Sequence, residues 1–327
     1  MRIAILHSDD ALEPPRDPVL DQIAEALEGA GHEAALVTSG TDVADLVARL
    51  RQVNPELVFN LSESFQDRSA LDASLAALLT LLDLRYTGSS QSSLMLAGDK
   101  SLTKKILRFH DIETPGFATL YRGALDSADE LRFPVIVKPP QEDASIGITT
   151  ASVVHDLKEL FTRIDELQAE HRSPVLVEEY VDGREFYVGV LGNAHAEALP
   201  PMEMDFSGFP EDRPRVASWD AKWGTDGAGA GAEYSGTRSV FPRDLDPALA
   251  ERLGQVAVEA FRALRLRDYA RVDFRLRADG TLLVIEVNPN CYLERCAEFA
   301  RSAEQADISY DALIARIVEL AAARYAR

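Results

Sequence analysis

The segment between Asp273 and Asn288 carries oxygen-bearing side chains at a spacing that suits a metal ion. Two strand-like runs flank Asp279-Gly280, which is a strong signal for a two-residue hairpin loop. Counting outward from that loop pairs Asp273 with Glu286, and alternation along the strand turns Asn288 to the same face as Glu286. Carboxylate and amide oxygens suit Mg²⁺, which also takes phosphate oxygens and water. A half-exposed hairpin with one polar face is the alternative interpretation.

Neighbouring residues complete the two faces of this hairpin. Arg271 precedes Asp273 by two residues and therefore shares its face, where a guanidinium can neutralise developing negative charge. The opposite face is predicted to be an apolar underside, in which Val272, Phe274 and Leu276 meet Leu283, Ile285 and Val287. The pattern thus predicts a charged site on one side of the sheet and a packed core on the other.

A second segment has residues that suit phosphate binding. Lys138 follows the apolar run Pro134–Val137 and precedes a loop with Ser145 and Gly147, whose backbone N–H groups can cradle phosphates. An ordinary lysine at a strand end is the alternative. The sequence has neither a P-loop nor a GxGxxG fingerprint, which disfavours the nucleotide-binding classes built on those motifs.

Acidic residues close the strand that is predicted over 175–179. Glu178 and Glu179 are followed by Tyr180, Val181, a turn glycine and Glu185. Carboxylates placed there can accept hydrogen bonds from the amine and hydroxyl groups of a nucleotide. A solvated strand edge is the alternative.

The elements that must position these side chains begin with an alternating pattern. Up to about residue 97, strands predicted over 2–7, 33–38 and 57–61 alternate with helices over 18–30, 42–52 and 69–82, which indicates βαβ units and a parallel sheet. Ligands bind at the carboxyl ends of the strands in such sheets. Asn60, Ser62 and Glu63, together with Asp9 or Asp10, are therefore candidates to hold the amine of a first substrate.

The rest of the chain mixes strands and helices in an α+β pattern. Strands are predicted over 133–139, 149–154, 175–179 and 185–191, and helices over 99–110, 157–169, 247–264 and 310–323. A polar, glycine-rich stretch runs from about residue 205 to 236. Loops of this length inside a compact domain are usually functional and are often lids, and a disordered insertion is the alternative.

Composition narrows the classes of partner. The 327 residues include 34 Lys and Arg against 54 Asp and Glu, and the net charge of −20 argues against nucleic acid and against an anionic membrane surface. No apolar window is long enough to span a bilayer. Cys291 and Cys296 are too few for a disulfide framework or a zinc site and are expected to be reduced thiols. We expect a cytoplasmic protein.

Taken in order, seven segments resemble the ATP-grasp superfamily, specifically its D-alanine–D-alanine ligase-like branch. They are DKSLTK at 99–104, FPVIVKP at 133–139, EDASIG at 142–147, VEEYVDGREF at 177–186, WDAKW at 219–223, ARVDF at 270–274 and IEVNPN at 285–290. The resemblance implies an α/β fold, in part α+β, with three domains. These are an N-terminal Rossmann-like substrate domain over 1–97, a central ATP-grasp subdomain over 98–184, and a C-terminal ATP-grasp subdomain with the lid loop and metal site over 185–327.

The resemblance also implies roles for single residues. Lys100, Lys138 and the loop residues Ser145, Ile146 and Gly147 would bind the phosphates of ATP, and Lys222 would reach the γ-phosphate from the lid. Glu178, Glu179, Tyr180 and Val181 would line the adenine pocket, and Glu185 would bind the ribose hydroxyls. Asp273, Glu286 and Asn288 would hold two Mg²⁺ ions, with Mn²⁺ as an alternative, and Arg271 would stabilise the tetrahedral intermediate.

The reaction implied by the resemblance has two steps. A substrate carboxylate attacks the γ-phosphate of ATP, and an amine then attacks the acyl-phosphate to give an amide, with release of ADP and phosphate. A closed lid keeps water from hydrolysing the acyl-phosphate. Small-molecule carboxylate and amine substrates are the implied partners, and a homodimer is expected because relatives of this type are often dimeric.

Both substrate half-sites depart from the pattern of true D-alanine–D-alanine ligases. Their glycine-rich turn with a serine and a glutamate is replaced by His7-Ser8-Asp9-Asp10, and Ala144 and Trp223 stand where they carry a serine and a tyrosine bonded to that glutamate. On the acceptor side, Pro289–Arg295 replaces a stretch with serine and glycine. Arg295 can bind a carboxylate bidentately, and an ordinary surface arginine is the alternative. The candidate substrate contacts are Asp9, Asn60, Glu63, Trp223, Asn290 and Arg295.

We therefore expect an ATP-dependent amide or peptide ligase that does not use D-alanine for both partners. The alternatives are a D-alanine–D-alanine ligase proper, an ATP-grasp phosphotransferase that stops at phosphorylation, and a non-catalytic nucleotide-binding protein. The full set of Lys, Asp, Glu and Asn positions disfavours the last of these, and Arg271 favours amide formation over phosphorylation alone.

Overall fold

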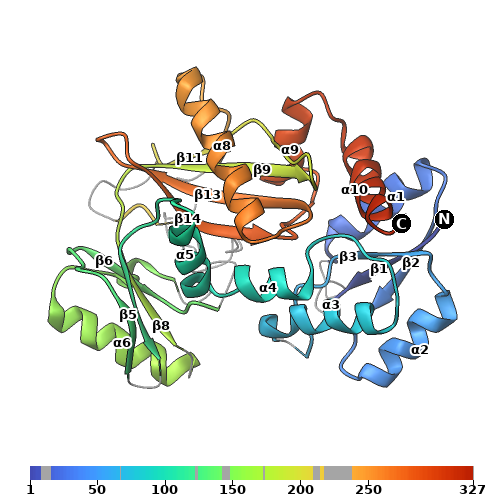
Figure 1. The fold of residues 1–327 in the computed structure, drawn as a ribbon, viewed down its shortest axis with the longest axis horizontal. Helices are drawn as coiled ribbons and strands as arrows, with labels where there is room; N and C mark the ends of the chain where they lie inside the picture. Colours follow the sequence, from blue (N-terminus) through green and yellow to red (C-terminus); the bar gives the residue numbers. More distant parts are fainter. Residues whose placement is uncertain are drawn as a thin grey trace.

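The computed structural model describes residues 1–8, 16–66, 68–121, 124–141, 148–171, 174–208, 214–216 and 238–326. Within them the chain forms three sheets, each from its own part of the sequence, with helices around them (Figure 1). The parallel first sheet and the antiparallel sheets with helices that follow it confirm the expected α/β, in part α+β, fold. None of the helices in these residues is long and apolar enough to cross a membrane.

The first sheet is parallel and has the order β2-β1-β3. Its strands are β1 (Arg2–His7), β2 (Glu33–Thr38) and β3 (Leu57–Asn60), and its helices are α1 (Pro18–Gly29), α2 (Val43–Val53) and α3 (Asp72–Leu81), with a 3₁₀ turn at Ser69–Leu71. Asp17 and Asp42 accept hydrogen bonds from the first turns of α1 and α2, as helix-capping residues do. The predicted βαβ organisation is confirmed.

The second sheet has the order β5-β4-β8-β6-β7, and all of its pairings are antiparallel. The strands are β4 (Phe117–Tyr121), β5 (Ala124–Ala128), β6 (Val135–Lys138), β7 (Val153–Val154) and β8 (Val175–Glu179). The helices α4 (Gln91–Ala97) and α5 (Lys100–Phe109) precede this sheet in the chain, and α6 (Leu157–His171) lies between β7 and β8 in the sequence. The sequence pattern does not predict the β4–β5 hairpin. α6 packs on the face formed by Val135, Val137 and Val177.

The prediction of a strand over residues 149–154 is wrong for most of that range. Residues Thr150–Ser152 form a 3₁₀ turn, and only Val153–Val154 form a strand. The backbone N–H of Ser152 donates to the Thr149 carbonyl, and the Thr149 N–H donates to the Ser152 hydroxyl. Such local bonds of serine and threonine compete with strand pairing.

The third sheet has the order β12-β11-β9-β13-β14, with β10 beside β9. The strands are β9 (Arg184–Gly192), β10 (Glu197–Ala198), β11 (Met202–Asp205), β12 (Arg238–Val240), β13 (Asp268–Leu276) and β14 (Leu282–Pro289). α8 (Pro247–Ala263) packs with Phe186, Val272 and Phe274. α9 (Glu298–Gln305) and α10 (Tyr310–Arg324) follow β14. Most of the predicted lid loop lies outside the described residues.

The β13–β14 hairpin differs from its prediction in two places, and the two differences have opposite effects on the register of the strands. The loop has three residues, because the Arg277 N–H donates to the Thr281 carbonyl and Gly280 adopts a φ of +85°. The register then shifts between Asp273 and Phe274. Asp273 therefore still pairs with Glu286, as predicted.

The predicted apolar underside of this hairpin is partly wrong for the same reason. Leu282, Val284 and Val287 share the core with Val272 and Phe274, whereas Leu283 lies opposite Arg275. Ile285 lines a cavity beside Glu286. The extra residue of the bulge moves Ile285 out of the core face.

The two ends of the chain share one hydrophobic core. Ile3 and Leu20, near the N-terminus, cluster with Tyr269, Phe299 and Ile314. α10 consequently lies beside α1, and the termini lie close together at the right of Figure 1. We propose that the three sheets mark the domains expected at 1–97, 98–184 and 185–327, with α9 and α10 returning to the first of them.

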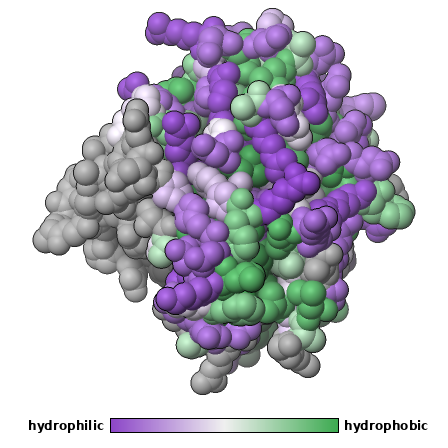
Figure 2. Space-filling model, turned by 90° about the vertical axis from the view of Figure 1, so that its left-hand side faces the viewer, coloured by the Kyte–Doolittle hydropathy of each residue, from purple (hydrophilic) through white to green (hydrophobic). Residues whose placement is uncertain are grey.

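The surface on the side of the second sheet is mostly hydrophilic. Figure 2 shows this face, where polar side chains cover most of the area and hydrophobic ones gather in its lower half. The exposed large hydrophobic residues include Leu157 and Phe161 of α6. A dominant polar surface fits a chain of net charge −20.

Candidate functional site

Within the described part of the chain, one cavity collects most of the residues that the sequence singles out for the nucleotide and the metal. Its lining comes from the second and third sheets and from the start of α5, and we call it the inter-sheet cavity. It is lined by Lys100, Ile136, Lys138, Ile148, Glu178, Glu179, Tyr180, Val181, Glu185, Val216, Asp273, Arg275, Ile285 and Glu286. Alternation along β6 and β8 explains part of this set, because Ile136, Lys138 and Glu178 share the face opposite the α6 core.

Glu178 lies in a buried cluster of charges. Its Oε2 is 3.0 Å from Lys138 Nζ and 3.2 Å from Lys104 Nζ, and all three side chains are almost fully buried. Burial would raise the pKa of Glu178, but Lys104 and Lys138 outweigh it and hold that pKa below its ordinary value. Lys104 is a residue that sequence reasoning missed. The available signal was its position four residues after Lys100 on the same helix, which places both on one face.

Glu185 is held by two partners, Arg275 of the neighbouring strand β13 and Tyr187 of its own strand β9. Arg275 Nη2 lies 2.5 Å from its Oε2, and the Tyr187 hydroxyl donates to its Oε1 at 2.6 Å. Arg275 also donates to the carbonyls of Gly183 and Arg215. The sequence analysis missed Arg275, although its place two residues after Asp273 puts it on the site face.

The predicted metal face forms as one cluster. Arg271 binds Asp273 bidentately, with Nε at 2.7 Å and Nη2 at 2.9 Å, and Asn288 Nδ2 donates to Asp273 at 3.0 Å. Glu286 lies 2.8 Å from Lys100 Nζ. The repulsion expected between the opposed carboxylates is thus offset by two basic side chains.

The donor set on this face fits Mg²⁺. In the described part of the chain no three His, Cys, Asp or Glu residues cluster as metal ligands. Two carboxylates and the Asn288 amide oxygen nevertheless suit an ion that uses one or two carboxylates and completes its shell with phosphates and water.

Arg271 is fixed on several sides. Besides Asp273, it lies 3.6 Å from Glu298 and over the Tyr187 ring at 5.0 Å. Burial would lower the pKa of Arg271, but Asp273 outweighs it and raises that pKa well above its usual range. The guanidinium is therefore a permanent, oriented positive charge beside the metal face.

The ends of β1 and β3 meet, as the parallel sheet requires. The Ser8 hydroxyl accepts hydrogen bonds from the backbone of Glu63 and Ser64, and Asn60 Oδ1 accepts from the Ser62 N–H. Asn60 is buried, whereas Glu63 is exposed. These residues do not line the inter-sheet cavity.

The two described acceptor-side candidates have structural contacts elsewhere. Asn290 adopts a φ of +49°, and its Oδ1 accepts a hydrogen bond from the Ser89 N–H at 2.8 Å. Arg295 lies over the Tyr310 ring at 4.5 Å and 3.7 Å from Asp311. Neither lines the inter-sheet cavity. Asp9, Ser145, Ile146, Gly147, Lys222 and Trp223 lie outside the described residues.

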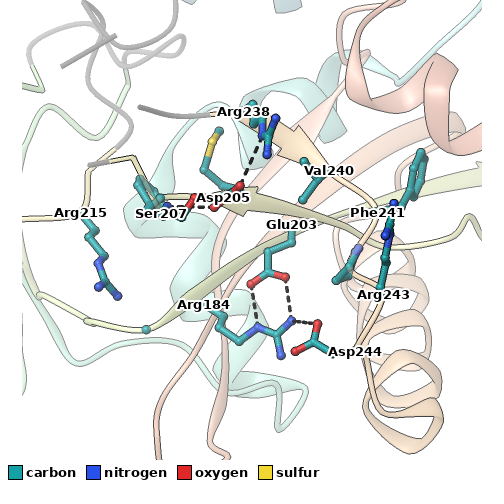
Figure 3. A pocket seen from close by; sticks show the side chains of 14 residues that line it. Arg184, Glu203, Asp205, Ser207, Arg215, Arg238, Val240, Phe241, Arg243 and Asp244 are labelled. Carbon is teal, nitrogen blue, oxygen red and sulfur yellow. Dashed lines mark hydrogen bonds and ion pairs between the residues drawn. The ribbon is translucent and has the colours of Figure 1, made fainter. Parts of the chain in front are cut away.

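A second hollow of about 690 Å³ lies at the β11–β12 edge of the third sheet. Figure 3 shows Arg184 bound to both oxygens of Glu203 and near Asp244, and Arg238 reaching toward Asp205. Because these ion pairs form among the lining residues themselves, and because the side chain of Arg238 is largely exposed, we assign no ligand to this hollow.

Comparisons with known proteins identify the family. Residues 107–319 match the family model described as D-ala D-ala ligase C-terminus. A D-alanine–D-alanine ligase of Bordetella petrii is 31% identical and is aligned over 91% of this chain and 87% of its own length. An uncharacterized protein of Sinorhizobium fredii, y4sG, is 33% identical over 95% of this chain and 89% of its own.

A solved structure shows the same fold. The crystal structure of D-alanine–D-alanine ligase from Bacillus anthracis complexed with ATP superposes with a TM-score of 0.76 at 24% identity, and the match covers 98% of this chain and 97% of that one. The chain therefore belongs to the D-alanine–D-alanine ligase family of ATP-grasp enzymes, ATP-dependent ligases that form a carbon–nitrogen bond with release of ADP and phosphate.

Proposed function

We propose that this ligase joins a small carboxylate and a small amine, both amino acids or amino-acid-like metabolites, and that D-alanine does not fill both roles. The observation that carries the proposal is the set of contacts made by residues 290–295. Asn290 binds the Ser89 backbone, Tyr292 donates to Asp17 at 2.7 Å, and Arg295 lies against α10. These side chains join the segment after β14 to the loop before α4, to the start of α1 and to α10, which supports an acceptor side unlike that of the D-alanine–D-alanine ligases.

ATP is proposed to occupy the inter-sheet cavity. Lys100 and Lys138 would meet its phosphates, Glu178 to Val181 would surround the base, and Glu185 would accept from the ribose hydroxyls. This assignment is supported by the presence of all these residues in one lining. Lys222 and the loop residues Ser145, Ile146 and Gly147 keep the phosphate-binding roles that the sequence predicts.

Asp273, Glu286 and Asn288 are proposed to hold Mg²⁺, two ions by resemblance. The ions would neutralise the phosphate oxygens when bound. Arg271 is oriented by Asp273 and Glu298, and we propose that it faces the negative charge that develops when the amine attacks the acyl-phosphate. A preorganised guanidinium favours this step because it needs no reorientation as the charge forms.

The substrate proposal is tested by incubating the protein with ATP, Mg²⁺ and pairs drawn from a panel of D- and L-amino acids and small amines. ADP, phosphate and condensation products are measured together. We expect that a substrate pair other than two D-alanine molecules gives a condensation product, with a kcat/KM higher than that measured for two D-alanine molecules. D-alanyl-D-alanine as the best product would identify a D-alanine–D-alanine ligase, and ADP formation without any condensation product would favour a phosphotransferase.

We also infer that the enzyme works in the cytoplasm, where ATP is available, and that it forms a homodimer. Cell fractionation tests the first inference, and sedimentation of the purified protein tests the second.

A further inference from the structure

We propose that Lys104 is a positioning residue for the nucleotide: it compensates the charge of Glu178 from outside the cavity lining, so that Glu178 can accept from the base and Lys138 keeps its charge for the phosphates. The inference rests on the proposed binding of ATP in the inter-sheet cavity. It adds a residue to which neither the sequence motifs nor the cavity lining assigns a role.

The contacts place Lys104 behind Glu178. Lys104 comes from α5, its side chain is 2% exposed, and it is absent from the lining of the inter-sheet cavity. Its Nζ lies 3.2 Å from Glu178 Oε2 and donates to the Thr114 hydroxyl at 2.7 Å. Thr114 therefore fixes the ammonium in the orientation in which it meets the carboxylate. Lys104 can reach a ligand only through Glu178.

The contact between Lys104 and Glu178 matters because it sets the net charge of the cluster. Glu178 carries one negative charge, and Lys104 with Lys138 supplies two positive charges within 3.2 Å of the same oxygen. With Lys104 charged, the trio has a net charge of +1, which remains available to an anionic ligand at Lys138. Without the charge of Lys104, Glu178 and Lys138 form an ion pair with no net charge. The attraction of Lys138 for phosphate then falls, because the buried carboxylate binds its remaining partner more tightly.

The carboxylate also keeps an acceptor for a ligand. Both lysines meet Glu178 at the same buried oxygen, Oε2, so these two contacts leave Oε1 to accept from a ligand. An ionised carboxylate accepts from an exocyclic amine and repels a carbonyl oxygen. A compensated, ionised Glu178 that faces position 6 of the purine therefore favours the amine of adenine over the carbonyl of guanine.

The cluster has a built-in pH limit. The pKa of Lys104 is lowered to about 8, mainly by burial and in smaller part by the charges of Lys138 and Arg108, against the opposing attraction of Glu178. Lys104 loses its proton as the pH rises through that value. Affinity for ATP is therefore expected to be constant below about pH 7 and to fall between about pH 7 and 9.

The first experiment measures binding of ATP and GTP with Mg²⁺ to the full chain by calorimetry, from pH 6.5 to 9.5, without other substrates. The affinity of the wild-type protein for ATP is expected to decrease about tenfold over the alkaline part of this pH range. A change of that size is the effect of one charge-assisted contact. A flat profile would overturn the proposal even if every variant failed to fold. If wild type binds no ATP at any pH, the proposed function fails instead.

The second experiment compares Lys104→Met and Lys104→Arg with Lys105→Met. Lys105 is on the same helix, but it pairs with Asp126 at the surface, so its replacement is the matched control. Lys104→Met is expected to raise KM for ATP about tenfold with a smaller change in kcat. The variant should also prefer ATP over GTP less strongly than wild type does. Its ATP affinity should no longer decrease as the pH rises. Lys104→Arg is expected to hold ATP affinity at pH 9. Lys104→Met with wild-type KM and an unchanged pH profile would refute the proposal.

Discussion

At the level of single residues, the inter-sheet cavity is lined by more acidic than basic side chains, but every one of its carboxylates is paired with a cation. Each carboxylate in its lining has a basic partner: Glu178 with Lys138, Glu179 with Arg277, Glu185 with Arg275, Asp273 with Arg271 and Glu286 with Lys100. A protein of net charge −20 can therefore offer a polyanion such as ATP a site in which local cations match the acids.

Glu286→Gln tests the metal role at this scale. The amide keeps the shape of the side chain and removes its charge, so kcat is expected to fall about 100-fold or more while the urea midpoint changes little. Asp279→Asn, at the exposed tip of the same hairpin, is the control and should behave as wild type. Turnover of Glu286→Gln with an unchanged dependence on Mg²⁺ would contradict the assignment.

The Arg275–Glu185 pair tests how a buried charge is supported. Both side chains are 6% exposed, so Arg275→Met leaves the Glu185 carboxylate without its cation and should destabilise the fold by about 3–5 kcal/mol. Glu185→Gln in addition should restore part of that loss, because no unpaired charge remains. Urea unfolding of both single variants and the double variant measures the coupling, and strictly additive effects would rule it out.

At the scale of elements, the β13–β14 hairpin shows how a tertiary contact sets a register. The Val284 N–H, next to the bulge, donates to the Glu113 carbonyl at 2.9 Å, so this part of β14 bonds to a segment outside the hairpin. The Asp279-Gly280 signal locates the turn but contains nothing about Glu113. The three-residue loop and the bulge were therefore beyond sequence reasoning, whereas the Asp273–Glu286 pair was within it.

Gly280→Ala tests the loop geometry. No neighbouring atom would meet the added Cβ, so the expected loss of about 1 kcal/mol in unfolding free energy comes only from the φ of +85°. Gly29→Ala is the matched control, because that site is equally open and belongs to helix α1, where alanine is neutral or stabilising. Chemical denaturation measures both variants. Equal effects would show that the loop does not require a left-handed residue.

At the scale of the whole molecule, Asp268 joins three distant parts of the chain. It is fully buried and accepts hydrogen bonds from the Gly88 N–H, Asn193 Nδ2 and Arg324. Arg324 also donates to the Tyr86 carbonyl at 2.8 Å. The last turn of α10 is thereby fixed to the loop after the first sheet and to β13, which carries the metal face.

Arg324→Met is expected to destabilise the fold by about 3–5 kcal/mol, because it leaves the Asp268 carboxylate buried without a cation. Arg316→Met removes an arginine from the same helix whose pair with Glu197 is largely exposed, so its cost should stay below about 1 kcal/mol. Thermal and urea unfolding compare the two. A similar small loss in both would show that Asp268 does not depend on Arg324.

Sequence reasoning recovers many of the local elements, the pairing of Asp273 with Glu286 and the motifs of the ligase family, because strand alternation, helix spacing and turn signals act between near neighbours in the chain. It misses the β4–β5 hairpin and the helices α4 and α9. Which cation compensates which carboxylate follows only from the folded arrangement of the sheets and helices. Lys104 meets Glu178, Arg275 meets Glu185, and Arg324 meets Asp268 across long separations in sequence. Such partners are fixed by packing between sheets and helices, where burial makes an unpaired charge costly, and no periodicity in the chain records them.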